Sequence, residues 1–291
     1  MFLTSGYAYD CAGDAAARFA GEQAGMTYSR LQNPTVEMLE HRIALLEGAE
    51  ACRTMATGMA AMTAALLEWR SDDALKAVII DHSEGRGFCA GGDINLLRES
   101  ALNDGGVSGR KFFHDEYQLN HQMMTFDKPI VAFMDGVTMG GGVGIALPCK
   151  YRVATENTRF AMPETGIGLF PDVGGGWVLA HAAGRIGTYL ALSGGRTKAA
   201  DSLYAGTATH YVADDRLAEF VAAIGDASIE ALLERYASDP GPAPLADNAD
   251  AITRCFSHPT VEDMLFALDA ETGAWAEKAA ASMRRVSPTS L

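Results

Sequence analysis

Two neighbouring runs of residues decide the fold, Ala77-Val-Ile-Ile-Asp81 and Gly85-Arg-Gly-Phe-Cys-Ala-Gly-Gly-Asp-Ile94. A short, continuously apolar and β-branched run predicts a strand buried on both faces. The glycines behind it predict a tight turn, because glycine adopts backbone conformations that other residues avoid. The same pairing returns at Pro129–Asp135 and Met139–Gly144. The chain therefore repeats a buried strand followed by a glycine-rich turn.

Helical patterns alternate with these strands. A third strand is expected at Tyr151–Thr155, and helices are expected at residues 111–125, 142–147, 173–183 and 198–205. The helix at 142–147 should end before Pro148, because the residue that precedes a proline avoids the helical conformation. Strands that alternate with helices indicate an α/β domain, and we place this core at residues 67–212.

The chain on either side of this core is predicted to be helical. Residues 1–66 contain an amphipathic pattern at Pro34–Glu47, followed by Gly48, which suits a helix end. A second helix is expected at residues 58–69. Residues 213–291 also favour helices, with a loop at Asp239–Pro244 and a last helix from residue 258 to 285.

Composition limits the classes of function. The 291 residues are 48% hydrophobic and carry a formal net charge of -14. This charge argues against nonspecific nucleic-acid binding, which needs a basic field. No cluster of cysteine and histidine suggests a metal site. We find no secretory signal and no apolar run long enough to span a membrane.

The five cysteines are scattered along the chain and never form a C-x-x-C pair. An odd number without such pairs favours free thiols in a reducing compartment. We therefore expect a cytoplasmic protein.

The glycine-rich turns can supply backbone N–H groups to a ligand. Two such donors that converge on one oxygen form an oxyanion hole, which serves acyl transfer or enolate formation at a carbonyl. Neither turn has the glycine spacing of a nucleotide-binding loop. Close packing of strand against helix remains the alternative explanation for a glycine turn taken by itself.

Four motifs together resemble the crotonase superfamily: F-C-A-G-G-D-I, M-G-G-G-V-G, R-V-A-T-E and F-A-M-P-E-T-G-I-G-L-F-P-D-V-G-G, at residues 88–94, 139–144, 152–156 and 160–175. Further motifs at residues 112–120, 189–194, 208–212 and 287–291 resemble its 3-hydroxyisobutyryl-CoA hydrolase branch. The resemblance covers about residues 67–291. It implies a crotonase-like ββα spiral core and thioester hydrolysis of a 3-hydroxyacyl-CoA in valine catabolism.

The resemblance also implies a set of site residues. The N–H groups of Gly92 and Gly141 would form the oxyanion hole. Glu164 would be the base or nucleophile, while Asp172 and Glu116 would hold the 3-hydroxyl group and the attacking water. Crowded, buried carboxyl groups shift their pKa values apart, which separates such roles. A covalent anhydride and an activated water both remain open for Glu164.

A hydratase or isomerase acting on enoyl-CoA is the close alternative. Hydratases of this superfamily usually carry a catalytic glutamate at the position of Gly144 and a glycine at the position of Asp172. This sequence departs from both, which favours hydrolysis. We expect an acyl-CoA substrate, no metal and no cofactor, and a homo-oligomer is an open possibility because relatives often form trimers or hexamers.

Residues 1–66 resemble a different family, the pyridoxal-phosphate-dependent sulfhydrylases such as O-succinylhomoserine sulfhydrylase. The resemblance lies in residues 28–35, 45–50 and 57–61. In that family Tyr28 and Arg30 would reach a cofactor phosphate, with Gly58 and Met59 beside it. We find no equivalent of the lysine that anchors pyridoxal phosphate, and therefore expect no activity with this cofactor.

The chain thus resembles a fusion in which a foreign helical segment replaces the usual N-terminal strands. Related hydrolases also continue beyond Ser287–Leu291, so we expect a shortened C-terminal region. A third hypothesis follows, in which a chimeric and truncated chain has little or no activity.

Overall fold

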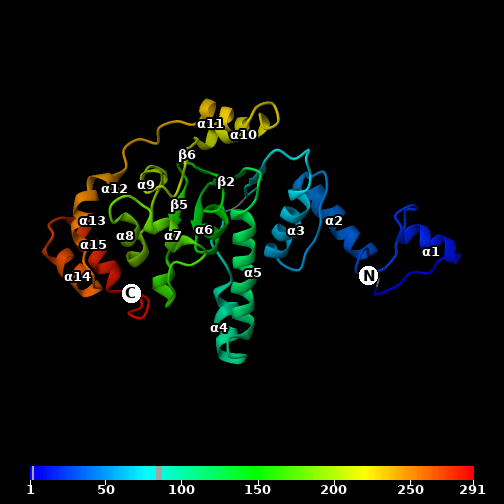
Figure 1. Ribbon diagram of the computed structural model, residues 1–291, viewed down its shortest axis with the longest axis horizontal. Coiled ribbons are helices and arrows are strands. Elements are labelled where there is room, and N and C mark those ends of the chain that lie inside the picture. The colour runs from blue at the N-terminus through cyan, green and yellow to red at the C-terminus, as the bar shows by residue number, and fades with distance from the viewer. Residues whose placement is uncertain (2, 83–86) are drawn as a thin grey trace. The chain divides into compact units, whose positions relative to one another are not determined.

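The computed structural model describes every residue except 2 and 83–86, so Gly85 and Arg86 of the first glycine-rich turn lie outside the described residues. The chain divides into two compact units, which we call unit 1 (Met1–Ala65) and unit 2 (Leu66–Leu291). Figure 1 labels the α-helices of both units and some strands of unit 2.

Unit 1 is built from helices α1 (Ala12–Phe19) and α2 (Pro34–Glu47) and most of α3 (Gly58–Arg70). The predicted bounds of α2 are confirmed at both ends. The Asn33 side chain accepts a hydrogen bond from the Thr35 N–H at 2.9 Å, and Gly48 ends the helix in the left-handed conformation. Only Thr27, Asn33 and Ala44 are buried among the described residues of this unit.

Unit 2 contains a four-stranded parallel sheet in the order β1-β2-β4-β6. Its strands are β1 (Val78–Ile80), β2 (Ile130–Met134), β4 (Tyr151–Ala154) and β6 (His210–Tyr211). All five residues of β2 are buried, as a strand covered on both faces requires. The predicted α/β class and the three predicted strands are therefore confirmed.

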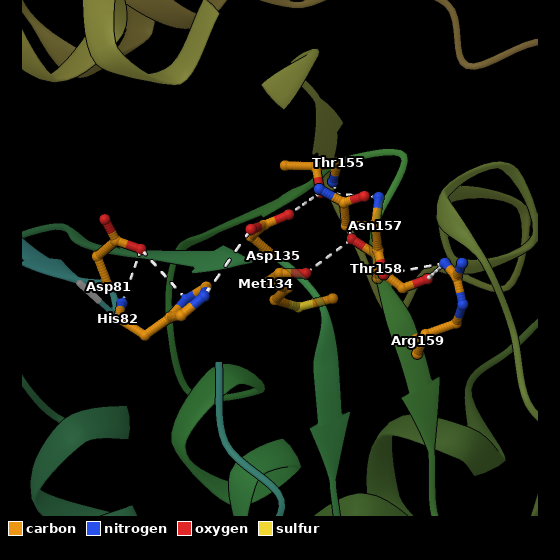
Figure 2. Close-up of polar contacts among 8 residues, drawn as sticks. All are labelled: Asp81, His82, Met134, Asp135, Thr155, Asn157, Thr158 and Arg159. Atoms are coloured by element: carbon orange, nitrogen blue, oxygen red, sulfur yellow. Dashed lines mark hydrogen bonds and ion pairs between the residues drawn. The ribbon is translucent and has the colours of Figure 1, made fainter. Parts of the chain in front are cut away.

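A second, two-stranded parallel sheet pairs β3 (Val137–Met139) with β5 (Arg159–Ala161). The sequence did not predict these strands, because each is three residues long and contains a polar residue, so no continuous apolar run marks it as it marks β1. Gly136, at φ 74°, bends the chain between β2 and β3. Beyond the end of β2, the Thr155 hydroxyl donates to the Asp135 carboxylate, and the Thr158 hydroxyl donates to the Met134 carbonyl at 2.7 Å (Figure 2).

In the described part of unit 2, seven helical segments lie between α3 and β6 along the chain. They are α4 (Ile94–Asn103), α5 (Val107–Met124), α6 (Gly141–Ala146), the 3₁₀ helix η1 (Glu164–Ile167), α7 (Gly175–Ala180), α8 (Ile186–Ser193) and α9 (Ala199–Tyr204). The four predicted helices correspond to α5, α6, α7 and α9. The helix predicted at 173–183 is shorter than expected, because the chain turns at Val173 and Gly174, which both have positive φ.

The C-terminal part of unit 2 is helical as expected, with α10 (Asp214–Ala222), α11 (Ile229–Tyr236), α12 (Pro244–Asp247), α13 (Ala249–Cys255), α14 (Val261–Ala270) and α15 (Ala274–Met283). The single helix predicted from 258 to 285 is wrong. The chain breaks between α14 and α15, where Gly273 has a φ of 120° that no helix contains.

One core joins the sheet of unit 2 to its helices. Phe133 of β2 lies edge-on to Phe220 of α10, with ring centroids 5.4 Å apart, and Tyr236 of α11 contacts the same phenylalanine. Leu232 and Leu233 complete this face with 2% exposure each. This packing fixes the strands whose carboxyl ends lead into the glycine-rich turns.

Candidate active site

The described parts of the two glycine-rich turns lie against each other. The Phe88 N–H donates to the Asp135 carbonyl at 2.8 Å, and the Cys89 N–H donates to the Val137 carbonyl at 2.9 Å. In return, the Met139 N–H donates to the Cys89 carbonyl at 3.0 Å. These bonds pair the first turn with β3 in the manner of a short β-strand.

Glycine is required where the turns touch. A Cβ atom on Gly142 would overlap the carbonyl group of Cys89. Gly91 has a φ of 105°, and a Cβ there would lie 3.0 Å from the Gly141 nitrogen. Side chains would therefore force the two turns apart, so the close approach depends on glycine.

The structure brings the amides of Gly92 and Gly141 into the lining of one pocket. The Gly92 nitrogen lies 3.3 Å from the position that a Cβ on Gly141 would occupy. Within the described part of the chain, neither amide donates a hydrogen bond. Two neighbouring free N–H groups can bind one oxygen atom, which is the geometry an oxyanion hole requires.

Three carboxylic acids from separate elements reach the same pocket. Glu116 comes from α5, Glu164 opens η1, and Asp172 lies just before α7. Their exposed fractions are only 8%, 4% and 9%. One Glu164 carboxylate oxygen (Oε1) lies 3.3 Å from the Cβ position of Gly140, and Glu116 Oε1 lies 2.8 Å from that of Gly141. Glu164 and Glu116 thus lie next to the second glycine-rich turn.

Burial shifts the pKa values of these acids upward. Loss of solvation raises the pKa of Glu164 to about 7, a backbone N–H opposes the shift, and the charge of Asp172 adds to it. Burial likewise raises the pKa of Glu116 to about 7, again with a contribution from Asp172. The pKa of Asp172 is raised as well, mainly by burial. The pocket therefore holds carboxyl groups that can exchange protons near neutral pH.

Glu164 has an unused hydrogen-bonding atom. Its Oε2 is buried and has no hydrogen-bond partner among the residues that the structure describes. No lysine or arginine occurs among the described lining residues, so no cation there neutralises the acid. A buried polar atom without a partner is costly, and in a pocket a ligand or water can satisfy it.

The rest of the pocket wall is apolar. The pocket has a volume of about 230 Å³, and its apolar side chains are Ile94, Leu97, Phe112, Phe113, Ile167 and Leu169. Phe112 also closes over Gly92, because a Cβ on that glycine would lie 2.6 Å from its ring. A wall of this kind suits a short acyl group rather than a charged one.

One residue that the sequence analysis missed shapes the site. Val173 follows Asp172, is 2% exposed and has a φ of 45°, which makes it the single described residue other than glycine with positive φ. Its side chain fills the space next to Gly144, where an added Cβ would lie 2.6 Å from Val173 Cβ. No sequence signal joins these positions, because only the tertiary fold makes them neighbours.

The remaining candidates lie elsewhere. In unit 1, the Arg30 guanidinium lies over the Tyr28 ring, 5.3 Å from its centroid. Among the described residues, no three histidine, cysteine, aspartate or glutamate side chains form a group that could hold a metal ion. The same part of the chain has no helix long and apolar enough to cross a membrane.

Two family models match the chain. The model described as enoyl-CoA hydratase/isomerase matches residues 41–291, and that of the Cys/Met metabolism PLP-dependent enzymes matches residues 1–80. The two matches bear out the interpretation of the chain as a fusion. Its helix-rich start and its α/β part thus resemble proteins of different kinds.

Curated relatives include the mitochondrial 3-hydroxyisobutyryl-CoA hydrolases of Danio rerio (40% identity) and Xenopus laevis (42% identity). The matches cover 78% and 77% of this chain but 62% and 60% of those proteins, so the chain spans about three fifths of their length. A similar solved structure is a carnitinyl-CoA dehydratase from Mycobacterium thermoresistibile, with a TM-score of 0.76 and 40% identity, over 79% of this chain and 67% of that one.

Proposed function

The chain belongs to the enoyl-CoA hydratase/isomerase family, and from this premise we propose that it hydrolyses 3-hydroxyisobutyryl-CoA, or a close 3-hydroxyacyl-CoA, to the free acid and CoA. The observation that carries the proposal is the buried Glu164 carboxyl. Its Oε2 has no hydrogen-bond partner in the described chain, and it shares a pocket with the free amides of Gly92 and Gly141.

In this mechanism the thioester carbonyl oxygen accepts hydrogen bonds from the two amides, which stabilise its negative charge as the carbonyl carbon is attacked. The attacking oxygen belongs either to the Glu164 carboxylate or to a water that Glu164 deprotonates. A carbon–oxygen bond forms, the carbon–sulfur bond breaks, and CoA leaves as a thiolate that takes up a proton. In the first route, water then hydrolyses the anhydride and regenerates Glu164.

Asp172 and Glu116 have a supporting role in this proposal. Both reach the pocket beside Glu164. The pKa of Glu116, raised to about 7, allows its protonated oxygen to donate a hydrogen bond near neutral pH, while the Asp172 carboxylate can accept one. A 3-hydroxyl group offers both a donor and an acceptor to such a pair. This arrangement supports a hydroxylated acyl chain over a plain one.

Enoyl-CoA hydration is the second candidate, favoured by the similarity to the solved carnitinyl-CoA dehydratase. The close packing at Gly144 argues against it. A glutamate at this position would need the space that Val173 fills, so the second acid of a hydratase does not fit this site. The pair of Gly144 and Val173 therefore supports hydrolysis.

The setting of the reaction is also part of the proposal. We place the enzyme in valine catabolism, without metal, pyridoxal phosphate or another bound cofactor, and leave a homo-oligomer open. The five cysteines are free, which suits the cytoplasm, whereas the curated relatives are named mitochondrial. Cell fractionation with an antibody against the chain distinguishes these compartments.

A thiol-release assay tests the function. Purified protein should release CoA thiol from 3-hydroxyisobutyryl-CoA, detected with a thiol-reactive dye, and should leave the conjugated double bond of crotonyl-CoA intact in an absorbance assay. Loss of that double bond without thiol release would instead establish the hydratase. A cooperatively melting protein that gives neither reaction, and no heat on calorimetric titration with CoA, would establish an inactive chimera.

A further inference from the structure

The short helix that carries Glu164 has little support of its own. Helix η1 is a single 3₁₀ turn of four residues, and isolated turns of this length are unstable. The Glu164 carbonyl accepts hydrogen bonds from the N–H groups of Gly168 and Leu169, the latter at 3.1 Å. The Gly166 N–H donates to the Pro163 carbonyl at 2.9 Å. These bonds end on the carbonyls of Pro163 and Glu164, and the next carbonyl along the chain is that of Thr165.

The C-terminal residues supply a hydrogen-bond donor for the Thr165 carbonyl. The Ser287 N–H donates to the Thr165 carbonyl at 2.9 Å. Thr165 is only 1% exposed, so water has little access to replace this bond. A buried carbonyl needs a hydrogen bond, and the described chain provides this one from a distant segment. The residue directly after Glu164 is thus attached to the far end of unit 2.

Ser287 belongs to a turn that is itself ordered. We call residues Ser287–Ser290 the C-terminal turn. The Ser290 N–H donates to the Ser287 carbonyl at 3.0 Å, and the hydroxyls of Ser287 and Thr289 lie 2.8 Å apart. Pro288 occupies the second position, where proline presets the backbone of a β-turn. The Ser287 amide is therefore held in a defined direction.

The turn also has a rigid base. It follows α15, whose buried face includes Met283 at 0% exposure and contacts α8. Helix α8 ends at Gly194, where a Cβ would lie 3.5 Å from the Pro163 Cα atom and 4.0 Å from the Thr165 Oγ1 atom. Helix η1 therefore lies between the end of α8 and the C-terminal turn, with Glu164 facing the pocket.

From this geometry we propose that the C-terminal turn positions Glu164, and that the Ser287 amide is the positioning group. This inference rests on the role proposed for Glu164. The hydrogen bond fixes Thr165 and thereby the direction in which the neighbouring carboxyl enters the pocket. A small displacement of a catalytic group can lower the rate strongly, by up to about 100-fold for 1 Å.

The Ser287→Pro substitution tests the amide directly, because proline has no N–H. We expect kcat to fall about 10-fold and KM to change less than about 2-fold. Two variants serve as controls. Ser287→Ala keeps the amide and loses only the hydroxyl, and Val286→Pro introduces proline where the N–H has no acceptor among the described residues. Val286→Pro should retain kcat within about 2-fold of the parent, and Ser287→Ala, which loses one hydroxyl contact of the turn but keeps the amide, should lose less rate than Ser287→Pro.

The pH profile separates positioning from general destabilisation. If η1 loosens, water reaches Glu164, and the rising limb of kcat/KM should move to lower pH because less burial means a lower carboxyl pKa. If kcat falls but the rising limb of kcat/KM stays at the same pH, the substitution has only reduced the fraction of folded protein. That result would overturn the proposal. So would a Ser287→Pro protein that matches Ser287→Ala in both rate and pH profile.

An infrared titration makes the test independent of turnover. The carboxyl band that is absent from Glu164→Gln should titrate at lower pH in Ser287→Pro than in the parent. This readout survives even if the parent releases no thiol, so failure of the proposed reaction and failure of the positioning role are distinguishable. Should Ser287→Pro not fold, Pro288→Gly loosens the turn and should shift the same band in the same direction. An unshifted band there would contradict the proposal.

Discussion

Helices α2 and α11 have similar apolar content but different surroundings. On α2 of unit 1, Met38, Leu45 and Leu46 are 70%, 63% and 71% exposed, and Ala44 is the buried residue. On α11 of unit 2, Ile229, Leu232, Leu233 and Tyr236 are all buried against the sheet. The sequence predicts helical structure in both places, but apolar residues form a core only where a partner surface covers them.

The same contrast separates the two units in what they can do. Unit 2 holds buried acids, free amides and a strained valine in fixed relation, because the core holds their elements in place. Unit 1 has three buried residues among those described, so its side chains are not held in this way. Chemistry that needs precise geometry is therefore expected in unit 2.

The largest expected effect tests whether the chemistry is confined to unit 2. Glu164→Gln should lower kcat by roughly 100- to 10,000-fold, because an amide is neither a base nor a nucleophile. Arg30→Ala in unit 1 should leave kcat unchanged. Thiol-release kinetics measure both. The Tm of Glu164→Gln should equal or exceed that of the parent above pH 7, since a neutral amide has no buried charge. A loss of rate in Arg30→Ala would show that unit 1 also contributes to the reaction.

A matched pair of leucines compares the cores. Leu232→Ala should destabilise unit 2 by about 2–5 kcal/mol, because it leaves a cavity in a packed site. Leu46→Ala, at a position that is 71% exposed, should change stability by less than about 0.5 kcal/mol. Urea unfolding followed by tryptophan fluorescence and circular dichroism gives both values. Equal losses would mean that α2 is buried in solution.

Two helical glycines sharpen the comparison further. A Cβ at Gly144 would lie 2.6 Å from Val173, whereas a Cβ at Gly58 of unit 1 would meet nothing within 4 Å. Gly144→Ala should therefore cost about 1–3 kcal/mol of unfolding free energy through overpacking. Gly58→Ala should be neutral or stabilising by a few tenths of a kcal/mol. Thermal melts compare the two variants. A stabilised Gly144→Ala protein would show that the Val173 side chain moves to make room for the added methyl group.

The smallest expected effect concerns the pH dependence of unit 2. With the pKa of Glu164 raised to about 7, the active carboxylate is lost as pH falls through 7 rather than through 4.5. The kcat/KM of the parent should therefore rise up to tenfold per pH unit below pH 7 and then level off. Asp172→Asn removes one charge that raises the pKa of Glu164. The rising limb of kcat/KM in this variant should therefore move to lower pH by less than about one unit. A limb centred near 4.5 in the parent would mean that Glu164 is not buried in solution.

The sequence predicted the elements better than the site. The bounds of α2 follow from Pro34 and Gly48, and β2 follows from its apolar run, because these signals are local. Strands β3 and β5 were missed because each has three residues and gains its stability from pairing with the other. The break at Gly273 was missed because a lone glycine is tolerated in many helices.

The five predicted site residues line one pocket, but their selection came from the resemblance, since a charged residue after a proline or in a helix is most often solvated. The role of Val173 could not be predicted from the sequence. It depends on the space beside Gly144, which exists only once α6 and the turn after η1 are folded.

The contact between Gly142 and the Cys89 carbonyl also constrains how this protein can evolve. Any side chain at position 142 would separate the turns, so mutation cannot explore that position without losing the paired amides. The apolar wall has no such restriction, since residues such as Ile94, Leu97 and Leu169 meet the pocket through side chains that can be exchanged for others. The pocket wall can therefore change over generations, while the pair of amides depends on a position that only glycine can occupy.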